Sequence, residues 1–216
     1  MALAERGVTV GLVGRRRSTL ERVQRRLAGS NHLVDVVDLT SDAEVRRLVQ
    51  SFRSRFGRLD ILVHSNGSYA SGELASAKPA AFDRLWAANV RGPFVLTQLA
   101  LPALRETTGQ IVFVNSTVGL ESRPGVGHFA ATQHALRALA DVFRTELNPE
   151  GIRVLSIYPG RTATSRQRRI YRGEDRTYEP ERLLQPEEIA TIVVESLALP
   201  RTAEVVDVHI RPLQKP

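Results

Sequence analysis

The chain has 216 residues, 42% of them hydrophobic, which is enough for one α/β domain with a sizeable core. It contains no apolar run of about 18 residues, no signal-peptide pattern at its start and no cysteine. These features argue against a membrane-spanning helix, a disulfide framework and thiol catalysis, and they favour a cytoplasmic protein without a membrane partner. The net charge of +7 comes almost wholly from arginine. Because no nucleic-acid motif accompanies the arginines, we interpret them as residues of solvated helix faces.

Short apolar runs alternate with helical patterns along the whole chain. Ala2–Arg6 followed by Gly7 is typical of a last helical turn and its cap. The apolar runs predict six strands, at 8–13, 32–37, 61–63, 111–114, 152–157 and 205–210. The helical patterns predict helices between them, at 18–28, 40–56, 80–105, 128–147 and 186–199.

Two of these helix starts carry good capping residues. Ser18 is a suitable N-cap for the helix that begins there, and Thr40 or Ser41 suits the next helix. Strands that alternate with helices indicate a mostly parallel sheet that is covered on both faces. We therefore expect one domain over residues 1–216, a Rossmann-like doubly wound parallel sheet in a three-layer α/β/α arrangement.

The stretch Ile111–Leu147 carries the strongest functional signal. Its strand leads to Ser116, and a loop broken by glycine and proline then leads to a long helix. This layout resembles the active-site segment of the short-chain dehydrogenase/reductase family, in which a strand ends in a catalytic serine and Tyr-x-x-x-Lys follows thirteen residues later. The flanking sequence AATQHAL sets the register, and it places Phe129 and Gln133 where the family has tyrosine and lysine.

These two replacements remove the groups that handle the proton in the family. The tyrosine hydroxyl donates a proton to the forming alkoxide, and the lysine lowers the pKa of that hydroxyl. Phe129 has no proton to give and Gln133 has no charge. A spacing of four puts both on one helix face, and loss of a general acid costs on the order of 10²–10⁴ in rate. The resemblance thus implies a degenerate active site that keeps Ser116 and Asn89, the latter matching the helix asparagine of the catalytic set.

Further matches to the family cover nearly the whole chain and imply a cofactor site. Arg15 and Arg16 stand where the family contacts the cofactor ribose, and arginine there implies NADP(H) because guanidinium pairs with the 2′-phosphate. A solvated turn is the other interpretation of these two residues. The remaining positions that the resemblance assigns to the cofactor are Asp38 and Leu39 at the adenine, Asn66 and Gly67 after the strand predicted at 61–63, and Pro159, Gly160 and Thr164 at the nicotinamide.

The beginning of the chain departs most from the family. Family members start with a strand and Thr-Gly-x-x-x-Gly-x-Gly, whose backbone N–H groups bind the cofactor pyrophosphate at a helix N-terminus. Here Met1–Gly7 resembles the end of that first helix. We therefore expect six strands, an N-terminally truncated sheet without the family's first strand, and a gap with unpaired backbone groups where that strand would lie. A gene start placed too late, an excised fragment or a truncated protein would each explain this. Because the glycine loop is absent from the chain as given, we do not expect it to bind a dinucleotide tightly.

The resemblance leaves two main functions open. The first is an NADP(H)-linked oxidoreductase that interconverts a small-molecule carbonyl and alcohol; its substitute proton donor would come from His128, His134, Tyr171 or Tyr178, all of which we interpret as structural or surface residues. The second is a non-catalytic relative that acts as a scaffold or regulatory partner. Family members often associate through the helices at 80–105 and 128–147, so we expect a homo-oligomer. Nucleic-acid binding by the arginine clusters is a third hypothesis, and no metal site is predicted.

Overall fold

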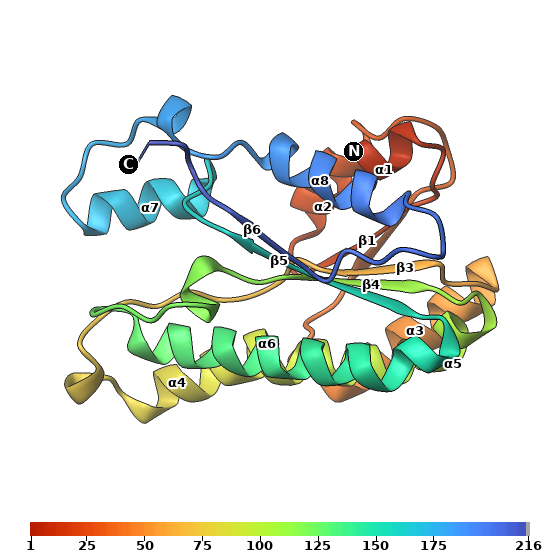
Figure 1. Ribbon diagram of the computed structural model, residues 1–216, viewed down its shortest axis with the longest axis horizontal. Helices are drawn as coiled ribbons and strands as arrows, with labels where there is room; N and C mark the ends of the chain where they lie inside the picture. The colour runs from red at the N-terminus through yellow and green to blue at the C-terminus, as the bar shows by residue number, and fades with distance from the viewer. Residues whose placement is uncertain (215–216) are drawn as a thin grey trace.

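The computed structural model describes residues 1–214, in which strands and helices alternate (Figure 1). The strands are β1 (Gly11–Gly14), β2 (Leu33–Val36), β3 (Ile61–His64), β4 (Gln110–Val114), β5 (Arg153–Pro159) and β6 (Asp207–Ile210). The α-helices are α1 (Ala2–Glu5), α2 (Arg17–Gln24), α3 (Asp42–Phe56), α4 (Pro79–Trp86), α5 (Gly92–Glu106), α6 (Gly127–Leu147), α7 (Ser165–Gly173) and α8 (Pro186–Leu197). The shorter helical turns are η1 (Leu74–Ser76), η2 (Ala87–Arg91), η3 (Thr117–Gly119), η4 (Asn148–Glu150) and η5 (Pro180–Arg182).

Every strand pairing is parallel. β1 pairs with β2, and β3, β4, β5 and β6 form a second sheet in that order. Helices α3, α4, α5 and α6 cover one face of the strands, whereas α1, α2 and α8 lie on the other (Figure 1). This arrangement confirms the predicted doubly wound, three-layer α/β/α fold.

The predicted gap lies between β1 and β3. Within residues 1–214 no strand pairs with the facing edges of these two strands, so their hydrogen bonding is divided into sheets of two and four. Val13 of β1 and Val63 of β3 keep 36% and 37% of their surface exposed, although parallel strands of this kind are normally buried on both faces. The six predicted strands are confirmed, and the gap divides what would otherwise be one sheet.

The side chains of β4, which pairs with β3 on one side and β5 on the other, pack alternately into the two helical layers. Ile111 and Phe113 pack with side chains of α5 and α6, such as Phe143, whereas Val112 packs with Val193 of α8. The three β4 residues are at most 1% exposed. Burying each such side chain contributes about 1.5–3 kcal/mol relative to leaving it in water. An apolar run without polar alternation is what a strand covered by helices on both faces requires.

The first predicted helix cap is wrong and the second is right. α2 begins one residue before Ser18, and no side chain caps it. It also ends at Gln24 instead of Ala28, because the Arg26 and Leu27 N–H groups bond to carbonyls only three residues back and His32 Nε2 lies 2.8 Å from the Ala28 carbonyl. At α3, the Ser41 hydroxyl accepts a hydrogen bond from the Glu44 N–H, as an N-cap does.

Two predicted segments contain more structure than expected. The helix predicted over 80–105 is interrupted by the π-helical turn η2, which separates α4 from α5. The polar stretch after the fifth strand contains α7. Among residues 1–214, no helix combines the length and the apolarity that crossing a bilayer requires.

His64 ends β3 in the core, where it contacts both neighbouring layers. Its ring stacks on Phe113 with centroids 4.8 Å apart, and its Nε2 lies 2.8 Å from the Thr97 hydroxyl on α5. Burial lowers the pKa of His64 from its ordinary value of 6.5 to about 3. The ring is therefore neutral at pH 7, and protonating it would place an uncompensated charge in the core.

This burial predicts a specific loss of stability in acid. Between pH 6.5 and 3 the unfolded chain binds a proton that folded His64 does not, so its contribution is present above pH 6.5 and is lost as the pH falls. From pH 7 to pH 5 we expect a loss of about 2 kcal/mol in the free energy of unfolding from this residue. Urea unfolding at both pH values measures it.

Two variants separate this effect from other titrating groups. His64→Gln can keep the hydrogen bond to Thr97 and should lack this part of the loss. His209→Gln, at an exposed position of β6, should lose as much stability between pH 7 and pH 5 as the native chain does. If His64→Gln and the native chain lose equal stability, His64 is not the group that titrates.

Candidate functional site

A cavity of about 820 Å³ opens at the carboxyl ends of β3, β4 and β5. In open parallel sheets the crevice outside the carboxyl ends of the strands is the usual place for a ligand. The wall of this main cavity continues to α1 and, through Val10 and Val63, to the gap between the two sheets. The gap and the candidate site are therefore parts of one open region.

Most of the predicted site residues lie around the main cavity. Those that line it are Asn89, Ser116, Phe129, Gln133, Arg16, Asn66, Gly67, Pro159, Gly160 and Thr164. Arg15 lines a neighbouring cavity, and Asp38 and Leu39 line neither of the two. The fold thus assembles residues from six separate stretches of the chain into one site.

The side chain of Asn115 holds the end of β4 against α6. Its Nδ2 donates to the Gln133 carbonyl at 3.0 Å, and its Oδ1 accepts from the Ser116 N–H at 2.7 Å. A Cβ on Gly119 would lie 2.5 Å from Asn115 Oδ1, so only glycine fits there. The Ser116 Oγ accepts from the Val118 N–H at 3.4 Å. Asn115 therefore positions Ser116 at the cavity wall, a role that the sequence analysis missed although Asn115 immediately precedes the predicted serine.

Phe129 and Gln133 lie on the cavity-facing side of α6, and both are almost fully buried. The ring of Tyr69 meets Phe129 edge-on, with centroids 5.1 Å apart. Within the described residues Tyr69 is the one tyrosine on the wall of this cavity. The sequence analysis missed it because it lies in a loop; its place soon after a strand's carboxyl end was the available signal.

Asn89 lies in the π-helical turn η2 and is 1% exposed. Its Oδ1 accepts from the Ser68 N–H at 2.6 Å, and its Nδ2 donates to the Ser68 carbonyl at 3.0 Å and to the Thr132 hydroxyl at 2.9 Å. Gly67 has a φ of 147°, and a Cβ there would lie 3.0 Å from Asn89 Oδ1. The Asn89 side chain thus joins the loop after β3 to α6, and it uses its amide to hold the site together.

The turn after β5 is fixed by its backbone and by the start of α7. The Gly160 N–H donates to the Ile210 carbonyl of β6 at 2.8 Å. The Thr164 hydroxyl accepts from the Gln167 N–H at 3.1 Å and so caps α7. This wall of the cavity is built from hydrogen bonds that do not depend on a ligand.

Comparison with known proteins decides the family. The sequence profile of the short chain dehydrogenase family matches residues 1–175. The chain belongs to this family. An uncharacterized oxidoreductase of Staphylococcus aureus (strain USA300) is 29% identical over 212 residues, which cover 98% of this chain and 89% of the relative.

Solved structures of the same fold cover almost the whole chain. The alcohol dehydrogenase of Thermococcus sibiricus, complexed with 5-hydroxy-NADP, has a TM-score of 0.88 and 27% identity, covering 100% of this chain and 91% of its own. The 3-ketoacyl-(acyl-carrier-protein) reductase of Brucella melitensis, complexed with NADH, has a TM-score of 0.85 and 26% identity, with 96% and 89% covered. The predicted membership of the short-chain dehydrogenase/reductase family is therefore confirmed.

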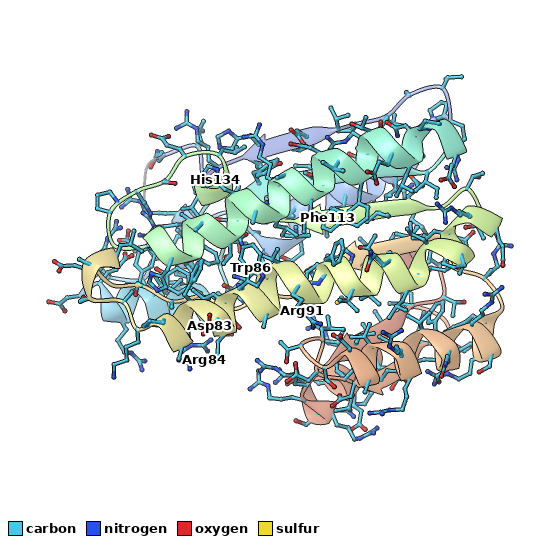
Figure 2. All side chains as sticks on the ribbon, turned by 90° about the horizontal axis from the view of Figure 1, so that it is seen from below. Asp83, Arg84, Trp86, Arg91, Phe113 and His134 are labelled. Carbon is cyan, nitrogen blue, oxygen red and sulfur yellow. The ribbon has the colours of Figure 1, made fainter. Side chains whose placement is uncertain are left out.

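The four substitute proton donors considered for this family member do not line the main cavity. His128 is buried, and His134 projects from α6 with its Nε2 3.2 Å from the Ser122 hydroxyl (Figure 2). Tyr171 and Tyr178 pack against each other edge-on, with centroids 5.6 Å apart. These positions agree with our interpretation of the four as structural or surface residues.

Asp38 and Leu39, the predicted adenine contacts, serve the turn that follows β2. Asp38 Oδ1 accepts from the Thr40 N–H at 3.0 Å and from the Thr40 hydroxyl at 2.8 Å. The hydrogen bond from the Thr40 backbone lowers the pKa of Asp38 most, and the charge of Arg15 adds to the effect. Leu39 packs beside the buried side chain of Val37. Their contact with an adenine ring stays a prediction.

Asn89 offers a test of how this site is held. Asn89→Ala would leave the Ser68 backbone groups and the Thr132 hydroxyl without their partner, and we expect it to lower the free energy of unfolding by roughly 2–4 kcal/mol. Asn66→Ala is the matched control, because Asn66 also bonds near η2, to the Ala88 carbonyl, but is exposed. The control should cost less than about 1 kcal/mol in the same urea titration. Equal losses would mean that Asn89 does not anchor the loop.

Proposed function

We propose that the chain is an NADP(H)-linked member of the oxidoreductase family whose conventional carbonyl reduction is very slow. One observation carries the proposal: Phe129 and Gln133 occupy the cavity wall at the positions where the family resemblance places the proton donor and its lysine. Neither side chain has a proton that could be transferred at neutral pH. The fold that positions a substrate is present, and the usual acid is replaced.

The main cavity suits the nicotinamide half of a dinucleotide better than the rest. Asn66, Pro159, Gly160 and Thr164 lie together on its wall, and Arg16 lies on the same wall near the first strand pair. Within residues 1–214 no glycine-rich loop opens a helix to receive a pyrophosphate. Family structures complexed with 5-hydroxy-NADP and with NADH support a nicotinamide cofactor for this fold. Such a cofactor would supply a hydride.

The chain's own groups can bind and polarise a carbonyl. The Ser116 hydroxyl, held at the end of β4 through Asn115, can donate a hydrogen bond to the carbonyl oxygen of a substrate. Phe129 presents an apolar ring on the wall of the same cavity, and Tyr69 meets that ring edge-on. The polarisation of the substrate therefore remains, whereas protonation of an alkoxide would depend on water or on a hydroxyl outside the Phe129 position.

A non-catalytic scaffold or regulatory partner is the second candidate, and the surface of the α4 and α6 layer favours it. Phe82 and Trp86 of α4 are 37% and 44% exposed, and Val142 of α6 is 53% exposed. Trp86 is labelled on this layer in Figure 2. Contiguous exposed apolar patches are typical of surfaces that meet another protein, and the Phe82 and Trp86 rings lie next to each other with centroids 6.3 Å apart. These helices fall within the segments through which we expect a homo-oligomer to form.

Cofactor titration tests the binding half of the proposal. We expect isothermal titration calorimetry to detect binding of NADPH by this chain that is weaker than micromolar, or none, because a pyrophosphate anchor is lacking among the described residues. Any binding should favour NADPH over NADH, and Arg15→Ala should remove that preference. Arg17→Ala is the control, since Arg17 pairs with Glu21 on α2. Micromolar binding would contradict the first expectation, and equal affinity for both cofactors the second.

Rescue of activity tests the chemical half. We expect Phe129→Tyr with Gln133→Lys to be insufficient for carbonyl reduction, because the nicotinamide must also be held within about 3–3.5 Å of the reacting carbon. Turnover should need both these substitutions and an added N-terminal strand with a glycine-rich loop. NADPH oxidation with a panel of ketones and aldehydes compares four proteins: the chain, the double variant, the extended chain, and the extended double variant.

Two results of this comparison would overturn the proposal. Robust turnover by the unextended double variant would show that the added strand and loop are unnecessary. Turnover by the extended chain without the substitutions would show that another group replaces the tyrosine.

A further inference from the structure

A second cavity, of about 370 Å³, lies beside the main one and is lined by three arginines. Arg15 comes from the turn after β1, and Arg166 and Arg169 come from α7. Ser68 and Ser71, from the loop after β3, complete the polar part of its wall. We call this space the arginine cavity. Ser68, Arg166 and Arg169 also line the main cavity, so a ligand could extend from one into the other.

The arginine cavity has more positive than available negative charge. Arg166 Nη2 donates to the Gly67 carbonyl at 2.6 Å, which gives it a hydrogen bond but no counter-charge. The carboxylate on the wall belongs to Glu174, and it accepts from Arg161 at 2.7 and 3.0 Å. Within residues 1–214 no salt bridge engages Arg166, Arg169 or Arg15.

The two α7 guanidinium groups disfavour each other's charge. Partial removal of Arg166 from water lowers its pKa, and the nearby charge of Arg169 lowers it further. An arginine nevertheless stays protonated in proteins, so the repulsion is relieved by an anion and not by loss of a proton. A spacing of three residues places both side chains on one side of the helix, where a single ligand can reach both.

We propose that the arginine cavity binds an oxyanion of the phosphate class, with Arg166 and Arg169 as its main ligands. A guanidinium donates two parallel hydrogen bonds to a pair of oxygens, so two guanidinium groups match the several oxygens of a phosphate better than the two of a carboxylate. Arg15 and the serine hydroxyls on the wall add further donors. Arg15 is shared with the cofactor site of the proposed function, whereas Arg166 and Arg169 are not among the cofactor positions assigned there, so their role goes beyond it.

Inorganic pyrophosphate is the probe for this site. We expect calorimetry at low ionic strength to detect its binding by the native chain, and Arg169→Gln to weaken that binding at least fivefold. Arg172→Gln is the matched control: it removes the same charge from the same helix, and Arg172 is exposed as Arg169 is, but Arg172 lines neither cavity, so binding should change less than twofold. Circular dichroism establishes that each variant is folded.

A pair of double variants makes the comparison stricter. Arg166→Gln with Arg169→Gln should abolish pyrophosphate binding, whereas Arg168→Gln with Arg172→Gln should retain it at the same net charge. Lack of pyrophosphate binding by the native chain would overturn the proposal. Equal weakening in both pairs would also overturn it, because the affinity would then come from the overall positive charge. Succinate binding as tightly as pyrophosphate would overturn the assignment to phosphates.

Competition identifies where the phosphate group comes from. If the arginine cavity serves a dinucleotide, 2′-phospho-ADP-ribose should displace pyrophosphate. If it serves a phosphorylated substrate, glucose 6-phosphate should displace it and 2′-phospho-ADP-ribose should not. If neither compound displaces pyrophosphate, the bound pyrophosphate is an adventitious ion only, and the proposal is overturned. These measurements are made without turnover, so their failure is distinct from a failure of the oxidoreductase proposal.

Discussion

Parallel pairing of β4 with β3 and β5 is the interaction on which the rest of the structure depends. It buries Ile111, Val112 and Phe113 between two helical layers and brings three strand ends to one edge. Asn115 then links that edge to α6 through the Gln133 carbonyl. The cavity is therefore positioned by the centre of the core, independently of the two proton-handling side chains that we propose are replaced.

The replacement of those side chains has little structural consequence. Phe129 packs against Tyr69, and Gln133 contributes its backbone carbonyl to the Asn115 link, which any residue at that position would provide. The family's tyrosine and lysine act through a hydroxyl and a charge, and neither is needed to hold α6 in place. On the proposed assignment of Phe129 and Gln133, the chain keeps its fold without the general acid, because catalytic and structural roles are carried by different atoms.

The gap between the two sheets differs from the changes at Phe129 and Gln133, because it concerns both the pairing of the strands and the shape of the main cavity. Val13 of β1 and Val63 of β3 are partly exposed on the two strands beside it, and the main cavity extends to it through Val10 and Val63. Unpaired strand edges are costly where they are buried, and here the cavity keeps this region open. Positive charge concentrates nearby, on Arg15 and on α7, whose arginines line the cavity beside the main one.

The sequence by itself determined the six strands, the parallel three-layer fold, the gap and ten residues of the main cavity, because apolar periodicity and motif spacing are local properties of the chain. It did not reveal the π-helical turn around Asn89, the role of Asn115 or the contact of Tyr69 with Phe129. Nor did it pair Arg15 with Arg166 and Arg169. Those features depend on side chains that are distant in sequence and meet only when the strand ends converge, so only the tertiary structure decided them.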